Sequence, residues 1–360
     1  NDFKYIVEYA DDVKSKIHGS DISFVVNRNI NYTNICSFKC NFCAFSKGRG
    51  HDDLRGEPYN ISEEEIIRRT NEAIDRGATE VCLQGGIHPK YSGETYLDIV
   101  RAIRSVSNTI HIHAFSPLEI DHGRKTLNVS VKEFLTELKK AGLNSLPGTA
   151  AEILHDDIRS IICPDKLNSN EWVEIIKSAH SIGLPTTSTM MFGHVENMFH
   201  VAHHLIKLLD IQNSTNGITE FVPLPFVADE APIFRRGKSR PGPTFKETIL
   251  VHSVARILFN GTINNIQGSW VKMGLPGLKY LLSSGINDIG GVLMNESITR
   301  SAGASFGQEL NLDDVLCIAD ELGLNLKQRN TLYEPLNNNL QDLINLQSIP
   351  LIPIINDYHQ

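Results

Sequence analysis

The chain has few cysteines, no long apolar run and no excess of basic residues, and each shortage excludes a class of protein. Six cysteines among 360 residues are too few for a disulfide-stabilised secreted scaffold. No apolar run reaches the roughly 18–20 residues that a membrane helix needs. A formal net charge of −8 lacks the basic footprint of nucleic-acid binding. The N-terminus also lacks the order of a secretory signal, so we expect a cytoplasmic globular protein that binds neither membrane nor nucleic acid.

Strand-like and helix-like segments alternate along most of the chain, at the roughly 30-residue spacing of βα units. Capping signals fix several helix starts, among them Ser62 with Glu65 and Ser130 with Glu133. Alternating units predict a parallel sheet, and eight such units can close into a barrel. The strands are expected at residues 25–35, 80–83, 109–115, 143–146, 186–192, 219–226, 262–267 and 288–293.

This pattern predicts an α/β fold, a (β/α)8 barrel of the TIM type with a C-terminal extension. We expect three parts along the chain. Residues 1–24 are a lead-in helix, 25–305 form the barrel, and 306–360 are a C-terminal helical extension and tail.

Three of the six cysteines, Cys36, Cys40 and Cys43, stand close together after the first expected strand. Thiolates spaced C-x3-C-x2-C can ligate three irons of a 4Fe-4S cluster, whereas an electron-transfer cluster takes four cysteines. No fourth cysteine lies nearby, which leaves one iron open, as a catalytic metal site requires. Zinc is the alternative, but it prefers two separated ligand pairs, and the spacing of His51 does not match such a pair.

The segment C-x3-C-x-aromatic-C, with Phe42 before the third cysteine, resembles the signature of the radical SAM superfamily. The resemblance implies two cofactors, a 4Fe-4S cluster on three cysteines and S-adenosyl-L-methionine. It implies reductive cleavage of S-adenosylmethionine to methionine and a 5′-deoxyadenosyl radical. It also implies that Phe42 lies beside the adenine. The turn Gln84-Gly85-Gly86 resembles the motif of that superfamily that binds the methionine amine.

Further polar residues stand where the expected strands end, which is where barrels place their active sites. Glu152 is expected to bind a ribose or an amine, and Arg159 a carboxylate. Met191 is expected to pack on the adenosine, and Glu196 to hydrogen-bond with it. The alternatives are ordinary structural roles: a capped helix start for Glu152, a surface charge for Arg159 and a core position for Met191.

Within the superfamily, residues 25–335 resemble the enzymes that form the second subunit of FO synthase. The similar segments include Asn31–Phe45, Glu220–Val227, Asn287–Gly307 and Gln328–Tyr333. The resemblance implies transfer of the 4-hydroxybenzyl group of tyrosine to 5-amino-6-(D-ribitylamino)uracil, with release of 2-iminoacetate. It implies FO synthase subunit 1 as a functional partner and a low-potential electron donor.

The tyrosine carboxylate needs a cation in a dry cavity, because an unpaired buried charge is costly. Arg300, counted among the catalytic residues, and Ser301 are the expected partners, and Lys272 is the second choice. The ribityl hydroxyls are expected to meet three polar side chains: Gln267, Asn295 and Glu296.

Two other interpretations remain open. Aminofutalosine synthase and dehypoxanthine futalosine cyclase, from menaquinone synthesis, share the cysteine segment. A non-catalytic iron–sulfur electron carrier is the alternative outside the enzymes, although the open iron and the polar strand ends argue against it.

Overall fold

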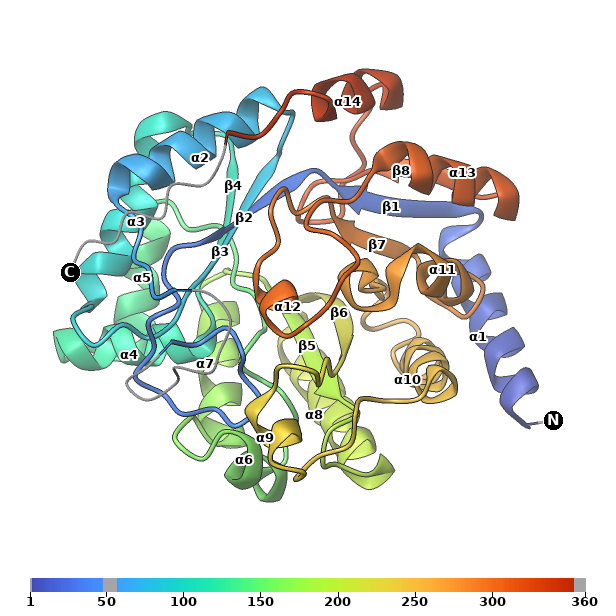
Figure 1. Ribbon diagram of the computed structural model, residues 1–360, viewed down its shortest axis with the longest axis horizontal. Helices are drawn as coiled ribbons and strands as arrows, with labels where there is room; N and C mark the ends of the chain where they lie inside the picture. The colour runs from blue at the N-terminus through green and yellow to red at the C-terminus, as the bar shows by residue number, and fades with distance from the viewer. Residues whose placement is uncertain (1, 48–56, 353–360) are drawn as a thin grey trace.

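The strands of the protein run parallel around one closed ring (Figure 1). The structure is a computed structural model that describes residues 2–47 and 57–352. Its strands are β1 (Asp21–Val25), β2 (Asn27–Asn31), β3 (Glu80–Gln84), β4 (His111–Ala114), β5 (Thr186–Phe192), β6 (Ile218–Pro225), β7 (Asp288–Gly291) and β8 (Asn325–Gln328).

Parallel pairing closes the ring through every neighbour. β2 pairs with β3 and β3 with β4, and residues 145–146 bridge β4 to β5. β5 pairs with β6, and residues 266–267 bridge β6 to β7. β7 pairs with β1, which runs directly into β2, so the circle is complete. The predicted α/β barrel is therefore confirmed.

The extended segment at the start of the barrel differs from its prediction. A single strand was expected over residues 25–35, but the structure has β1 and β2, which together span 21–31. β1 pairs with β7 and β8, and β2 pairs with β3. One continuous extended segment therefore joins the last strands of the ring to β3. The strands expected at 143–146 and 262–267 are reduced to their bridging residues.

The chain after residue 305 supplies a strand as well as helices. β8 pairs in parallel with β1, from Asn325 beside Asp21 to Gln328 beside Phe24. The sequence predicts only helix here, because the helical periodicity of 312–322 is long, whereas β8 alternates exposed and buried residues over four positions. The extension thus reaches the barrel wall.

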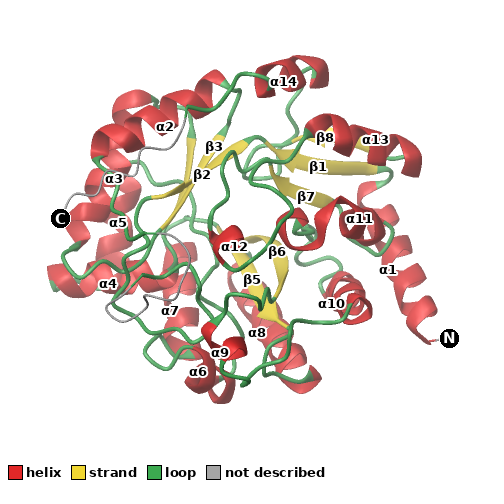
Figure 2. Ribbon diagram, in the orientation of Figure 1, coloured by secondary structure: helices red, strands yellow, loops and turns green. Residues whose placement is uncertain are grey.

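Helices surround the strands on the outside, except the short helix α12, which lies over the middle of the ring in this view (Figure 2). They are α1 (Asp2–His18), α2 (Glu63–Asp75), α3 (Gly93–Val106), α4 (Pro117–Leu127), α5 (Val131–Ala141), α6 (Asp156–Ile162), α7 (Ser169–Ser181), α8 (Met198–Thr215), α9 (Pro232–Arg235), α10 (Phe245–Leu258), α11 (Trp270–Leu282), α12 (Ile298–Ser301), α13 (Leu312–Leu322) and α14 (Leu340–Gln347). Among the described residues, no helix has both the length and the hydrophobicity for a membrane span.

Capping explains where several helices begin. The Ser62 hydroxyl accepts a hydrogen bond from the Glu65 backbone at 3.3 Å, and Ser130 forms the predicted capping box with Glu133. Helix α4 escaped the sequence prediction, although Ser116 and Glu119 form the same box around Pro117. That box lies directly after β4, so it also places two polar side chains at the mouth of the barrel.

Two buried apolar clusters hold the helices to the barrel. One packs the half around β2, β3 and β4 and includes Tyr32, Tyr96 and Phe115. The other packs the half around β5, β6 and β7 and includes Phe192 and Phe221. Burial on both faces of a parallel strand is expected where helices cover the outside and side chains fill the inside.

Candidate active site

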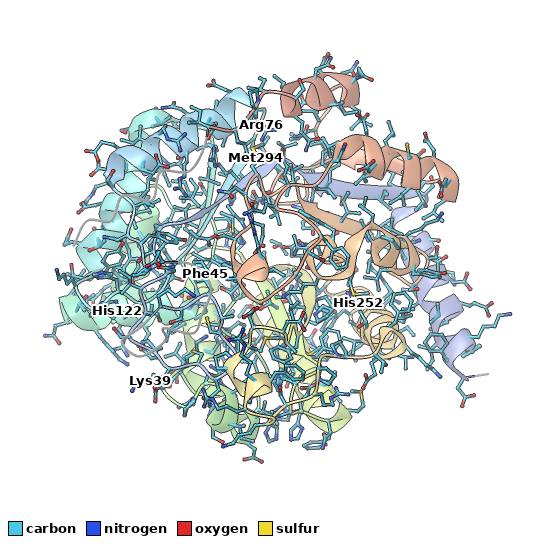
Figure 3. All side chains as sticks on the ribbon, in the orientation of Figure 1. Lys39, Phe45, Arg76, His122, His252 and Met294 are labelled. Carbon is cyan, nitrogen blue, oxygen red and sulfur yellow. The ribbon has the colours of Figure 1, made fainter. Side chains whose placement is uncertain are left out.

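Two adjoining chambers, each of about 250 Å³, occupy the barrel. The outer chamber is lined by the loops at the carboxyl ends of the strands, and the inner chamber by side chains within the ring, from Asn27 and Glu80 to Glu220. Side chains that line both chambers form a shared wall: Gln84, Thr149, Thr189, Leu224, Lys272 and Ile298. In Figure 3, Phe45 of the cysteine loop lies left of the centre of the view, and Met294 after β7 lies above it, near Arg76.

All three predicted cysteine ligands line the outer chamber, together with Phe42. Backbone N–H groups donate to two of the sulfurs, Ile87 to Cys36 at 3.3 Å and Ser46 to Cys43 at 3.4 Å. Hydrogen bonds of this kind stabilise thiolate ligands and tune iron–sulfur clusters.

The electrostatics of these thiols also suit an iron–sulfur cluster. Burial raises the pKa of the Cys40 and Cys43 thiols, and Lys166 opposes that rise at both. Buried thiolates therefore need further positive charge, which iron supplies. Among the described residues, no three His, Cys, Asp or Glu side chains converge to hold a single metal ion, and His51 lies outside the described part of the chain. The residues present fit the cluster better than zinc.

The glycine turn after β3 presses against the cysteine loop. A Cβ on Gly85 would lie 2.3 Å from the ring of Tyr32, and one on Gly86 would lie 2.3 Å from the Ile35 carbonyl oxygen. Real Cβ atoms do not approach so closely, so only glycine fits at both positions. The Glu119 carboxylate accepts a hydrogen bond from the Gly85 N–H at 3.3 Å and so holds the turn from behind. Backbone therefore lines this side of the outer chamber.

Glu152 follows the bridging residues 145–146, at the same end of the barrel as the glycine turn, and lines the outer chamber as well. Its Oε1 accepts a hydrogen bond from Lys166 at 2.7 Å, and the Lys166 ammonium lies 5.1 Å from the centre of the Phe42 ring. Burial raises the pKa of Glu152, but Lys166, Arg159 and His194 together bring it below its ordinary value, so the carboxylate stays ionised. The backbone is left-handed at Ala150 and Glu152, with φ of 57° and 46°, a conformation that clusters at functional sites.

Lys166 is a site residue that the sequence did not single out. It lies beyond α6, and nothing local marks it as different from a surface lysine. The sequence did not single out Thr149 or Thr189 of the shared wall as site residues either. Glu119 could have been found, because Ser116 and Glu119 carry a capping signal directly after an expected strand.

Two residues predicted for the outer chamber lie elsewhere. Arg159 donates to the backbone carbonyls of Ala150, Ala151 and Leu167, which occupy its guanidinium and keep it behind the chamber wall. Glu196 accepts hydrogen bonds from the Gly193 and His194 N–H groups at 2.6 and 2.9 Å. Neither side chain lines the cavity, whereas Met191, predicted beside them, does.

Of the residues predicted to bind the substrates, some line the chambers and others do not. Gln267, Lys272 and Glu296 line the inner chamber, but Arg300, Ser301 and Asn295 line neither chamber. Arg300 is exposed and donates to Gln308, and Asn295 accepts from the Gln308 amide at 3.0 Å. The physical reason is the orientation of α12: its Ile298 and Thr299 line the chambers, whereas Arg300 on the same helix is exposed to solvent.

Lys272 is the charged member of the shared wall. Among the described residues, no carboxylate forms an ion pair with its Nζ, and Glu296 and Glu152 act on it only through their charge. Burial lowers the pKa of Lys272, and those two carboxylates partly restore it. A partly buried ammonium without a paired anion is suited to receive an anionic group of a ligand.

The inner chamber ends at a polar floor that the sequence did not predict as a site. Arg329, 4% exposed, donates to Asp288 at 2.6 and 2.9 Å and to Glu220 at 3.3 Å. Thr331 donates to Glu80 at 2.6 Å. We use "the floor" for these five residues. Two of them come from the segment after β8, so the C-terminal extension contributes to the chamber.

Family models match this chain along most of its length. The model described as the radical SAM superfamily matches residues 30–208, and the CofH/MqnC C-terminal region matches residues 215–341. The second match includes the segment that carries Arg329 and Thr331.

Curated relatives are similar over nearly the whole chain. The 5-amino-6-(D-ribitylamino)uracil–L-tyrosine 4-hydroxyphenyl transferase of Methanopyrus kandleri is 47% identical over 92% of this chain and 88% of its own length. The protein of the same name from Methanothermobacter thermautotrophicus is 44% identical over 94% of this chain and 91% of its own length. The FO synthase of Mycobacterium leprae is 45% identical over 91% of this chain, which spans 38% of that longer protein.

Solved structures share the fold at low sequence identity. Methylornithine synthase superposes with a TM-score of 0.69 at 15% identity, over 96% of this chain and 91% of the other. The FeFe-hydrogenase maturase HydG from Carboxydothermus hydrogenoformans gives a TM-score of 0.68 at 15% identity, over 92% and 73%. These structures show the shared fold. The family models and the curated relatives establish that the chain belongs to the radical SAM superfamily and, within it, to the family of 5-amino-6-(D-ribitylamino)uracil–L-tyrosine 4-hydroxyphenyl transferases.

Proposed function

We propose that this protein transfers the 4-hydroxybenzyl group of tyrosine to C5 of 5-amino-6-(D-ribitylamino)uracil, and releases 2-iminoacetate, methionine and 5′-deoxyadenosine. One observation carries the proposal. In a chain of this family, the cysteine-lined chamber shares a wall with a second polar chamber, and Lys272 stands in that wall. The arrangement suits a cofactor in the outer chamber and substrates that extend inward.

The cluster, when bound, supplies the electron that cleaves S-adenosylmethionine to methionine and the 5′-deoxyadenosyl radical. Cys36, Cys40 and Cys43 would hold three of its irons and leave the fourth for the methionine amine and carboxylate. The backbone at Gly85 and Gly86 approaches from one side of the chamber without any side chain between.

The remaining outer residues would position the nucleoside. Phe42 and Met191 offer apolar surface to the adenine, and Glu152 offers a carboxylate to the ribose hydroxyls or the amine. Lys166 holds Glu152 in its ionised form through the 2.7 Å contact. In this proposal Arg159 and Glu196 support the walls from behind.

Lys272 is the proposed partner of the tyrosine carboxylate. Lys272 is partly buried and lines both chambers, so tyrosine bound there would present its Cα–Cβ bond between the cofactor and the inner chamber. Holding donor and acceptor on either side of one wall shortens the path of the benzyl fragment to C5, which is a proximity effect. This role replaces the one predicted for Arg300.

Two partners follow from the chemistry. Cleavage of S-adenosylmethionine takes one electron, and the adduct radical formed when the benzyl fragment adds to the uracil gives one electron and a proton back as it becomes a closed-shell product. We therefore propose a low-potential electron donor that reduces the cluster before the first turnover. We also propose FO synthase subunit 1 as the enzyme that uses the product. The names of the relatives favour this reaction over the two menaquinone-pathway enzymes.

An anaerobic assay tests the function. The reconstituted enzyme is incubated with S-adenosylmethionine, reductant, tyrosine and ribitylaminouracil, and the products are identified by mass. We expect a benzylated uracil, 5′-deoxyadenosine and 2-iminoacetate or its hydrolysis product, and none of them from Cys40→Ala. A product that joins an enolpyruvyl benzoate to the adenosyl group of S-adenosylmethionine, with none from tyrosine, would reject the assignment in favour of aminofutalosine synthase.

A further inference from the structure

The floor of the inner chamber is built from the starts of the barrel strands and from the C-terminal segment. Glu80 is the first residue of β3, Asp288 is the first residue of β7, and Glu220 lies near the start of β6. Arg329 and Thr331 approach from beyond β8. These side chains close the end of the barrel that is opposite to the cysteines.

The two glutamates of the floor keep acceptor capacity. Glu80 accepts one hydrogen bond on each oxygen, from Asn27 at 2.8 Å and from Thr331 at 2.6 Å. Glu220 accepts on Oε2 from Arg329 and Tyr333, and no described residue donates to its Oε1. An ionised carboxylate offers about four lone-pair sites, so both groups can accept further donors.

The charge of the floor selects for donors rather than for anions. Three carboxylates face one guanidinium, and Arg329 is already bonded to two of them. An anionic ligand group would meet repulsion there, whereas hydroxyl or N–H groups would find acceptors. The free cation of the chambers, Lys272, lies at the shared wall instead.

His113 extends the same polar surface up the wall. Its Nδ1 lies 2.7 Å from the Ser145 hydroxyl, and burial lowers the pKa of His113, so the ring is neutral. No described residue bonds to its Nε2, which is left for a ligand. The chamber therefore offers several hydrogen-bonding groups in a row, which suits a chain of hydroxyls better than a single phenol.

We propose that the floor is the subsite for the ribityl chain of the acceptor, with Glu80 and Glu220 accepting hydrogen bonds from its hydroxyls. Thr331 and Arg329 are positioning residues that hold these two carboxylates. The inference rests on the proposed function and adds to it the orientation of the acceptor. With the ribityl chain on the floor, the uracil ring points to the shared wall, where the benzyl fragment arrives.

Two acceptors test this subsite: ribitylaminouracil and its 6-pentylamino analogue, which has the same chain length without hydroxyls. For each acceptor we measure kcat/KM of benzyl transfer, and separately the tyrosine-dependent formation of 5′-deoxyadenosine. The wild type should prefer the ribityl acceptor by about tenfold or more, as expected for hydrogen bonds to charged groups. Glu220→Gln should lose most of that preference while 5′-deoxyadenosine formation continues.

A second variant and a control keep the test decisive if Glu220→Gln folds poorly. Thr331→Val removes the hydroxyl that holds Glu80 and should weaken use of the ribityl acceptor alone. Glu137→Gln, on the exposed face of α5, should behave as the wild type. Equal use of both acceptors by the wild type would overturn the proposal. So would a rise in the KM of tyrosine, rather than of the acceptor, in Glu220→Gln. Absence of tyrosine-dependent 5′-deoxyadenosine in the wild type would instead contradict the proposed function.

Discussion

The outer and inner chambers have similar volumes but are built in different ways. The outer chamber takes its main features from short continuous segments, the cysteine loop and the glycine turn. The inner chamber collects single side chains from strands and tail, from Asn27 to Thr331. A cofactor of fixed structure can be held by a contiguous motif, whereas substrate recognition depends on residues that only the closed barrel brings together.

The charges of the two chambers also differ. The outer chamber contains three thiols and the ammonium of Lys166 beside Glu152. The floor of the inner chamber contains three carboxylates and one guanidinium. From this contrast we infer that the two chambers bind different groups: the outer chamber binds the cofactor with its carboxylate, and the inner chamber binds hydrogen-bond donors. The following experiments test whether the two chambers bind these different groups, from the largest expected effect to the smallest.

The largest effect is expected from Cys40→Ala, which removes a ligand of the outer chamber. The reconstituted wild type should contain about four iron and four sulfide per chain, with brown absorbance. The variant should lose this absorbance and all formation of 5′-deoxyadenosine. Cys317→Ala, on the exposed face of α13, is the control and should keep both. Stoichiometric zinc without sulfide in the wild type would contradict the cluster.

Lys272→Met tests the wall between the chambers. The loss of a charged contact should raise the KM of tyrosine about tenfold or more, while iron content stays normal. Lys279→Met on the same helix removes an exposed lysine that pairs with Glu321 and should leave the kinetics unchanged. Steady-state kinetics at varied tyrosine measure both variants. If Lys272→Met kept the wild-type KM, the tyrosine carboxylate would have to bind elsewhere.

A smaller, pH-dependent effect is expected from the floor. Burial raises the pKa of Glu220 to about 7, with Arg329 opposing the rise and Asp288 and Glu80 adding to it, while Tyr333 donates to the same carboxylate. Glu220 is therefore protonated below this pH and ionised above it. Because the ionised form accepts hydroxyl hydrogen bonds better, kcat/KM for the acceptor should rise several-fold as pH rises through about 7.

The control for this pH profile is Glu220→Gln, which cannot titrate and should flatten the rise. The kcat/KM for tyrosine, measured over the same pH range, should not follow it. A profile that Glu220→Gln leaves unchanged would assign the ionisation to another group.

The smallest effect is expected from Arg300→Ala. Arg300 is exposed and bonded to Gln308, so its loss should change tyrosine kinetics by no more than about twofold, as for most surface substitutions. The same assay as for Lys272→Met measures it. A tenfold rise in the KM of tyrosine would restore the role first predicted for Arg300 and require its side chain to leave Gln308 and turn into the chamber.

The sequence by itself determined the barrel and the cysteine ligands of the outer chamber. The pattern of strands and helices follows from local periodicity and from caps such as Ser130 with Glu133, which are interactions within a few residues. The cysteine triad is equally local, because Cys36, Cys40 and Cys43 are held by one loop. The glycine turn was found for the same reason, although its contact with Tyr32 was not.

Only the tertiary structure decided which charged side chains face the chambers. Arg159 and Lys166 are both basic residues after the same strand, but three carbonyls capture the first, and Glu152 holds the second in the outer chamber. Arg300 stands at a strand end like Lys272, yet it lies on the exposed side of α12 and donates to Gln308. Arg329 comes from an extension whose strand spans four residues. In each case the direction of the side chain depends on contacts outside its own helix, strand or loop. The local sequence pattern does not reveal such contacts.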